Sequence, residues 1–376
     1  MKKRFLAALI ALLCVTAVFA SEAFAENSFD YSVSGGVVDL GGIRHDDVQT
    51  AVKELSKLKG VNELILGRED DTDLTWDDVN TLSNAVPDAV IDYEFKYLDA
   101  RFNLNCETFD LSYREIEDGG AEVRRLIPLM KKVTLVNMDT CGVDNETMAK
   151  LNADFPDVEI IWRVRFGERY GVLTNTEMIL ASCSDLAGDI TEETDDGLYY
   201  CTKVRYLDLG HNLKMRDIGF VRNMPELEVA ILAINTVQDF SPLADCPKLE
   251  YLELFNTGLS DLTPLSGLKN LRHLNICYNF GISDLSPLYS LTELERLWIG
   301  CYDPVPPEQI KKMREIAPNC EIETEVKDPT ESTWRITGSD ELGYNFYAPR
   351  YALLREQFDG YTEDSYSIDP RYKYGW

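Results

Sequence analysis

Histidines, cysteines and paired carboxylates are the residues of this sequence that could do chemistry. The chain has three histidines: His45 at the start of a predicted helix, His211 beside a turn and His273 on a predicted strand. No serine or cysteine stands in a nucleophile motif such as GxSxG, and no glycine-rich phosphate loop follows a predicted strand. The acidic runs lack the spacing of an EF-hand calcium loop. We therefore predict no enzyme, no cofactor and no metal.

One pair of carboxylates could act together. Asp208 and Glu253 are expected two strands apart on one face of a sheet, about 10 Å from each other at the usual strand spacing. An inverting glycosidase has roughly 6.5–9.5 Å between its two carboxyl groups. Ile231 also lies between the two acids. Glycoside hydrolysis therefore stays as a remote alternative.

The cysteines favour packing over metal binding. The sequence holds nine, of which Cys14 lies in the N-terminal leader, and no two form a CxxC pair. The eight others permit disulfides in an exported protein. Cys183 and Cys201 bracket an acidic segment, so these two form a candidate disulfide that would close that loop.

A short repeat must position these side chains. It reads LEVAILAINTVQDFSPLADCPK (227–248), LEYLELFNTGLSDLTPLSGLKN (249–270) and LRHLNICYNFGISDLSPLYSLTE (271–293), with one extra residue at Phe280. A fixed period this short is typical of a solenoid, in which stacked units share one core. Segment 204–226 fits the pattern with one insertion, and 294–300 begins a further unit.

Each recurring position has a physical role. Leu252 and Leu254 alternate with Glu253, which predicts a strand with one buried face. Asn235 and Asn279 can pair backbone groups of neighbouring turns, and Thr257 replaces this amide in the middle unit. We therefore expect Leu254→Ala to be costly, and Glu253→Ala to stay within about 0.5 kcal/mol because its side chain points outward.

The repeat resembles the leucine-rich repeat, and its D-L/F-S/T-P-L segment looks like the repeats of secreted, internalin-type bacterial surface proteins. The resemblance implies an α/β leucine-rich repeat solenoid, with a curved parallel sheet and short convex turns. The recurring prolines, Pro242, Pro264 and Pro287, favour such turns over long helices. The resemblance also implies adhesion or host contact.

A second, longer repeat predicts flanking βα units. Segments 61–95, 133–164 and 294–326 share an apolar strand, a polar turn, a helix and a second strand. Thr75 with Asp78 suits a capping box at the first of these helices. We divide the chain into a signal peptide (1–25), an N-terminal βα repeat-like region (26–170), an acidic connecting segment (171–203), a leucine-rich repeat domain (204–326) and a Tyr-rich C-terminal tail (327–376).

The leader and the charge indicate where the chain works. Lys2, Lys3 and Arg4 precede an apolar run, and Ala-Phe-Ala at 23–25 or Val-Phe-Ala at 18–20 suits a signal peptidase. We expect a secreted, extracellular protein at a bacterial cell surface, with no membrane insertion after cleavage. A net charge of −28 disfavours nucleic acid and anionic membrane as partners.

The strand residues that point away from the core define a candidate binding surface, which we call the outer sheet face and expect to be concave. Aromatic groups with arginine and a few polar groups are typical of the centre of an interface. We predict a protein partner, a host or bacterial surface protein, with a glycan or peptidoglycan as the alternative. In the remaining alternative the C-terminal tail folds over this face and buries it. The predicted site residues are Tyr206, Asp208, Ile231, Tyr251, Glu253, Phe255, His273, Asn275, Arg296 and Trp298.

Overall fold

The protein is described by a computed structural model, which covers residues 31–182, 190–300, 305–325, 334–339, 341, 345–357 and 366–373. The chain forms two compact units, Met1–Ile160 and Ile161–Trp376. The predicted signal peptide, residues 1–25, lies outside the described residues.

The first unit carries two sheets within its described part, residues 31–160. The larger sheet has the order β1 (Ser32–Ser34), β2 (Val37–Asp39), β3 (Glu63–Arg68), β4 (Val90–Tyr97) and β5 (Ala100–Asn103). Strands β2, β3 and β4 are parallel, and an antiparallel hairpin closes each edge. The smaller sheet contains β6 (Thr108–Asp110), β7 (Leu135–Asn137) and β8 (Glu159–Ile161).

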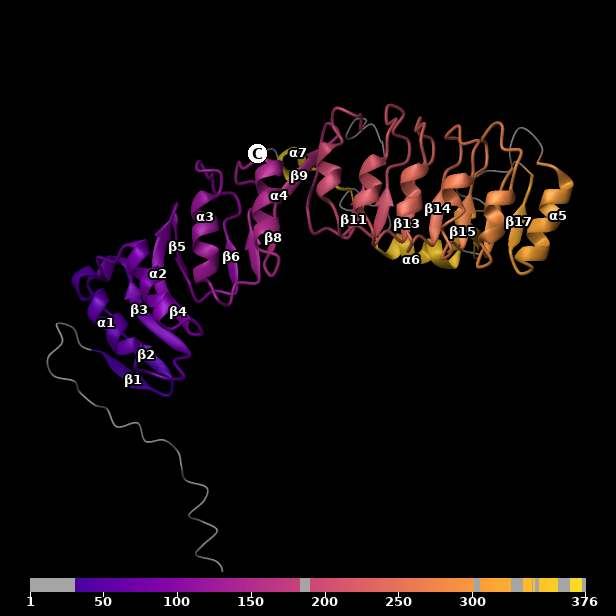
Figure 1. Ribbon diagram of the computed structural model, residues 1–376. Coiled ribbons are helices and arrows are strands. Elements are labelled where there is room, and N and C mark those ends of the chain that lie inside the picture. The colour runs from indigo at the N-terminus through magenta and orange to yellow at the C-terminus, as the bar shows by residue number, and fades with distance from the viewer. Residues whose placement is uncertain are drawn as a thin grey trace, which may run out of the picture. The chain divides into compact units, whose positions relative to one another are not determined.

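Helices follow the strands of this unit, as the longer repeat predicts. They are α1 (Val48–Leu55), α2 (Trp76–Ala85), α3 (Ala121–Leu126) and α4 (Asn145–Asp154) (Figure 1), with 3₁₀ turns η1 (His45–Asp47), η2 (Glu69–Asp71) and η3 (Ile127–Leu129). The predicted capping box is confirmed, because Thr75 and Asp78 bond each other's backbone N–H at the start of α2. Val79 and Leu82 are fully buried on its inner face.

The second unit is a leucine-rich repeat solenoid. Among its described residues, seven parallel strands form one sheet in sequence order: β11 (Met178–Leu180), β12 (Tyr206–Asp208), β13 (Val229–Ile231), β14 (Tyr251–Glu253), β15 (His273–Asn275), β16 (Arg296–Trp298) and β17 (Glu321–Glu323). The connecting coils carry 3₁₀ turns. Three of them contain the recurring prolines, as predicted: η6 (Ser241–Asp245), η7 (Thr263–Leu265) and η8 (Ser286–Ser290). Two earlier ones form without proline: η4 (Asp196–Tyr200) and η5 (Gly219–Asn223). Helix α5 (Pro307–Ile316) precedes β17.

The register explains the core. Leu207, Ala230, Leu252, Leu274 and Leu297 are aligned partners on successive strands, and all are fully buried. Each side chain packs on the same position of the next coil, so the units share one apolar interior.

The predicted amide ladder is confirmed. Asn279 accepts from the backbone N–H of Thr257 (3.0 Å) and Leu259 (3.2 Å), and it donates to the carbonyls of Leu254 (2.8 Å) and Ile276 (2.9 Å). Thr257 replaces the amide of its own unit with a hydroxyl that donates to Leu254 O at 2.9 Å. These bonds satisfy backbone groups that the tight coil buries.

The boundary between the compact units does not coincide with the predicted acidic connecting segment, 171–203. This segment contains β11 and η4, so it contributes the first strand and first turn of the solenoid sheet. It also contains most of β10 (Tyr170–Leu173), which forms an antiparallel hairpin with the preceding strand β9 (Arg163–Phe166). The described part of the segment lacks the leucine spacing of the later units, so the repeat pattern does not predict its strand β11.

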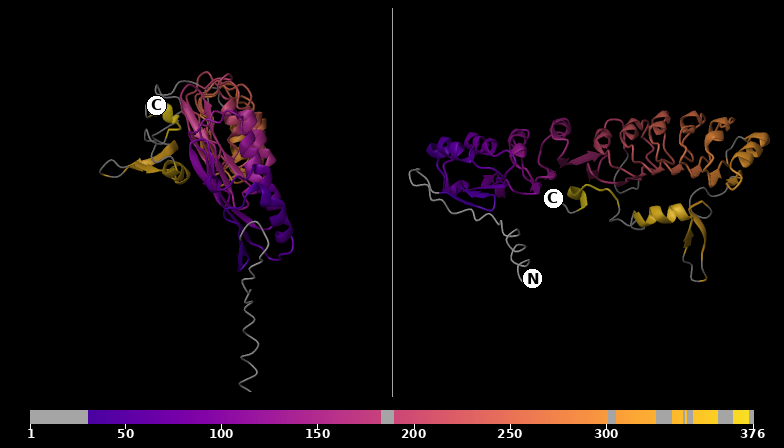
Figure 2. Two further views of the ribbon diagram at one scale, coloured as in Figure 1. Left: turned by 90° about the vertical axis from the view of Figure 1, so that its left-hand side faces the viewer. Right: turned by 60° about the horizontal axis from the view of Figure 1, so that its bottom comes forward.

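The C-terminal tail has structure of its own. Strands β18 (Ile336–Ser339) and β19 (Asn345–Tyr347) pair with each other, and helices α6 (Pro349–Gln357) and α7 (Pro370–Lys373) follow. Figures 1 and 2 place α6 on the side of the solenoid sheet opposite to the 3₁₀ turns and α5.

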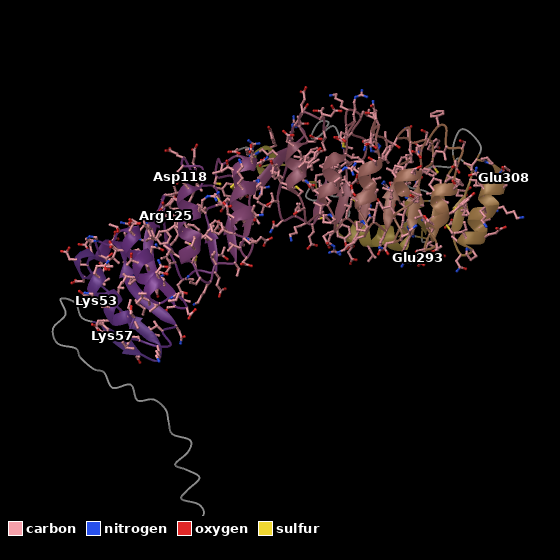
Figure 3. All side chains as sticks on the ribbon, viewed as in Figure 1. Lys53, Lys57, Asp118, Arg125, Glu293 and Glu308 are labelled. Atoms are coloured by element: carbon pink, nitrogen blue, oxygen red, sulfur yellow. The ribbon has the colours of Figure 1, made fainter. Side chains whose placement is uncertain are left out.

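Charged side chains such as Glu293 and Glu308, which Figure 3 labels, are exposed. Among the described residues, no helix has the length and apolar character needed to cross a bilayer.

An acidic group at the first coil makes stability depend on pH. Burial, with Asp196, Asp217 and Glu192 nearby, raises the pKa of Asp195 to about 6. The folded chain therefore binds this proton more tightly than the unfolded chain, so stability falls as pH rises from about 4 through 6. We expect Asp195→Asn to stabilise the protein at pH 7.5, on the order of 1 kcal/mol after allowance for solvent screening, and to have little effect near pH 3.5. Denaturant melts of both chains at the two pH values check this; an equal effect at both would contradict it.

Candidate functional site on the outer sheet face

The strand register brings the predicted site residues together on one face. One row runs across the sheet through Tyr206, Val229, Tyr251, His273 and Arg296. A second row runs through Asp208, Ile231, Glu253, Asn275 and Trp298. Phe255 lies two residues after the end of β14, and its side chain belongs to the same buried cluster. The predicted grouping of these side chains on one face is thus what the structure shows.

The outer sheet face is covered, so the expectation that its aromatic groups meet solvent is wrong. Tyr251, Phe255 and Trp298 are each at most 2 % exposed, because Trp334, Ala348 and Tyr351 of the tail pack against them. The alternative in which the tail folds over this face is the observed arrangement. Most other members are buried as well: Asp208, Ile231, Glu253, His273, Asn275 and Arg296. Tyr206 is partly buried and packs at the edge of the cluster.

Glu253 is the electrostatic centre of the site. Its side chain is 0 % exposed, which corrects the expectation that it points into water. Oε1 accepts from Trp334 Nε1 at 2.8 Å and from Arg335 Nε at 2.9 Å, and Oε2 accepts from Arg335 Nη2. The Tyr251 hydroxyl also donates to Oε1. A buried carboxylate loses several kcal/mol of hydration, and only a complete set of donors such as this one offsets that loss.

The same contacts set the protonation of the neighbouring groups. Burial, then the Glu253 carboxylate, raises the pKa of Tyr251 well above its usual value. Burial lowers the pKa of Arg335, but the Glu253 carboxylate acts more strongly the other way, so the net pKa is raised. At neutral pH, Arg335 is therefore a cationic donor and Tyr251 a neutral donor to Glu253.

The indole of Trp334 sits among rings from three strands. Its centroid lies 5.7 Å from Tyr251, 5.9 Å from His273 and 5.5 Å from Trp298. The Arg296 guanidinium carbon lies 5.0 Å from the centroid of the Trp334 ring, within range of a cation–π contact. Trp334 is 0 % exposed and belongs to the hydrophobic cluster of this face.

The tail groups that complete the site escaped the sequence-based prediction. Trp334 and Tyr351 stand out as aromatic residues of the tail, but no spacing connects them to strands about 80 residues earlier. Arg335 carried no signal other than its place beside Trp334. In the structure its guanidinium carbon lies 5.1 Å from the Tyr351 ring centroid while its nitrogens bind Glu253.

The other candidate groups lie apart or are already engaged. Asp208 and Glu253 are separated by Ile231 on the intervening strand, as expected, and Glu253 is bound by Arg335. Cys201 is buried, with its sulfur 3.7 Å from the Gly197 carbonyl oxygen. Cys183 lies outside the described residues, so the pairing of these two cysteines stays a prediction. Within the described part of the chain, no cluster of three or more His, Cys, Asp or Glu side chains could hold a metal ion.

A separate hollow lies outside this face. Its volume is about 700 Å³, and turns of successive coils line it, with Leu213 and Phe280 at its margin. Phe280, the extra residue of the third repeat, is 59 % exposed. It therefore offers an exposed aromatic control for experiments on the buried face.

Comparisons with known proteins add similarity but no family. No family model matches the chain. A 65-residue stretch is 35% identical to the mouse cilia- and flagella-associated protein 410, and it covers 17% of this chain and only 26% of that protein. Among solved structures, an internalin (InlF) of Listeria monocytogenes is 17% identical, with 78% of this chain and 83% of that chain covered and a TM-score of 0.35. The leucine-rich repeat protein LIC12759 of Leptospira interrogans is 18% identical, with 72% and 74% covered and a TM-score of 0.36. With similarities this low, the fold assignment depends on the chain's own repeat and strand register.

Proposed function

We propose that this chain is a non-enzymatic leucine-rich repeat protein that recognises a protein partner through its outer sheet face. One observation carries the proposal: this face already binds polypeptide. Trp334, Arg335 and Tyr351, remote in sequence from the strands, are held there by ring contacts and by hydrogen bonds to Glu253. Buried aromatic side chains together with arginine are typical of the centre of a protein interface.

The contacts favour a peptide over a glycan. Glu253 accepts from an indole and a guanidinium, and Arg296 Nη1 donates to the backbone carbonyl of Trp334. An indole, a guanidinium and a backbone carbonyl are all groups of a protein chain. A sugar would instead require several polar side chains that are available to form hydrogen bonds with its hydroxyl groups. The experiment below must therefore distinguish binding of a peptide from binding of a glycan or peptidoglycan.

The contacts of Glu253 also disfavour hydrolysis. A glycosidase needs one carboxylic acid that gives a proton and one carboxylate that activates water or attacks the sugar. Glu253 is held by the Arg335 cation and is sealed from solvent, so it cannot serve in either role without loss of the tail contact.

Export to a bacterial surface is part of the proposal and is supported by the N-terminal leader alone. Lys2, Lys3 and Arg4 followed by an apolar run are what a secretory signal requires. A partner on a host cell or on the bacterial surface is consistent with that location. N-terminal sequencing of protein recovered from the culture medium tests this part, and a chain that still begins at Met1 would contradict it.

Arrays of surface-protein peptides and of glycans, probed with the full chain, test the binding class. We expect retention on peptides and not on glycans. Arg335→Ala should increase peptide retention several-fold because it loosens the covering tail, and Glu253→Gln should abolish that increase. Phe280→Ala, which removes an exposed aromatic outside this face, should behave as wild type. Retention on glycans alone, or no response to Arg335→Ala, would overturn the proposal.

A further inference from the structure

Building on the proposed function, we infer that the outer sheet face is a receptor for a polypeptide segment that presents an indole next to a guanidinium. Trp334, Arg335 and Tyr351 of the chain's own tail occupy that receptor in cis, and a partner segment of the same chemistry binds by replacing them.

The buried carboxylate sets the requirement for the guanidinium. Glu253 has no contact with water, so any occupant must bring donors to both of its oxygens. Arg335 supplies them as a fork, Nε to Oε1 and Nη2 to Oε2. An ammonium group is a point charge and cannot bond both oxygens in this planar geometry. The occupant must therefore carry arginine, and the chain's net charge of −28 attracts such a segment.

The surrounding rings set the requirement for the indole. Trp334 lies within 6 Å of Tyr251, His273 and Trp298, measured between ring centroids, and its Nε1 reaches Glu253 Oε1 at 2.8 Å. Phenylalanine would fill the same space without a donor. An indole therefore satisfies both the packing and the hydrogen bond, and a neighbouring arginine completes the set.

The way the tail is held makes exchange possible. Among the described residues, the backbone-to-backbone hydrogen bonds of 334–357 stay within the tail, as in Ala348 N to Arg335 O at 2.9 Å, and β18 and β19 pair only with each other. By contrast, residues 366–369 bond the solenoid through backbone groups, with Gly171 N to Ser367 O at 2.8 Å and Ser367 N to Leu180 O at 2.9 Å. The described residues of 334–351 thus make no backbone-to-backbone bond with the solenoid: Trp334, Arg335 and Tyr351 contact it through their side chains, and the Arg296 side chain donates to the Trp334 carbonyl. Such side-chain contacts can be released while 366–369 stay anchored.

The described residues of the tail offer no acceptor to one buried donor of the receptor. Trp298 Nε1 is buried and has no acceptor among the described residues. A buried indole N–H without a partner is unfavourable. A partner segment that places a carbonyl or carboxylate there would bind better than the tail does, which favours replacement.

A synthetic peptide of residues 332–352, labelled with a fluorophore, tests this on the full chain. The double variant Trp334→Ala/Arg335→Ala vacates the receptor, and we expect it to bind the peptide with micromolar affinity, at least tenfold more tightly than wild type does. Adding Glu253→Gln to the double variant should weaken binding at least tenfold. A peptide with lysine at position 335 should bind at least tenfold more weakly. Arg222→Ala, which removes an exposed arginine paired with Asp245, is the matched control and should bind as wild type.

A second measurement covers the case in which the double variant does not fold. A protease site placed in 327–331 of the full chain allows the folded protein to be cut. We expect the cut chain to melt within a few degrees of the uncut chain and to take up the labelled peptide. Collapse of the solenoid on cutting would overturn the inference, since 334–351 would then be core. A folded double variant that ignores this peptide, yet binds arrayed peptides in a manner dependent on Glu253, would refute the ligand class and leave the proposed function standing.

Discussion

Glu253→Ala is expected to lower the free energy of unfolding by about 3–5 kcal/mol, because it leaves the Arg335 cation in the covered site without its partner. Trp334 Nε1 and the Tyr251 hydroxyl lose their acceptor in the same step. Equilibrium denaturation by guanidinium, followed by circular dichroism, measures the change.

A double-mutant cycle isolates the ion pair in this prediction. Removing Arg335 as well should recover part of the loss, so Glu253→Ala/Arg335→Ala should be less destabilised than the sum of the single variants. Strict additivity would mean that the two side chains do not interact in solution. A cost below about 0.5 kcal/mol for Glu253→Ala would restore the sequence-based expectation that this residue faces water.

Leu254→Ala should cost about 2–5 kcal/mol for a different reason. Leu254 is 0 % exposed in the shared interior of the coils, and its truncation leaves a cavity that the stacked units on both sides cannot close. Its effect should be independent of the tail, so Leu254→Ala and Arg335→Ala should add within about 0.5 kcal/mol. Loss of additivity, or a cost under about 1 kcal/mol for Leu254→Ala, would contradict the assigned strand register.

The repeat predicted the solenoid because its periodicity is local. Two-residue alternation placed Leu252 inward and Glu253 on the opposite face, and the register across β12 to β16 agrees. The amide position at Asn279 and the capping box at Thr75 are equally local, and both are confirmed. Each of these features needs only a few neighbouring residues, so a single sequence reveals them.

What lies on the outer sheet face could not be predicted in the same way. Alternation says which side of a strand a residue takes, but not what covers that side. The contact between Glu253 and Arg335 joins residues 82 positions apart, and no repeat links them. The aromatic composition of the face was equally consistent with a partner and with the chain's own tail. Only the packing of Trp334 and Tyr351 against Tyr251 distinguishes the two arrangements.

The contact of residues 366–369 with β10 and β11 has a consequence for the order of folding. Ser367 bonds both backbone groups of Leu180, on the first strand of the solenoid sheet, and Ile368 bridges to Tyr170. The coils can stack as they emerge from the ribosome, since their contacts lie about one repeat apart. The first strand of the sheet, β11, is not covered until almost 190 further residues have been synthesised. During that interval an apolar face and an unprotected strand edge are open to other chains, which makes the newly made protein prone to aggregation and dependent on rapid completion or on a chaperone.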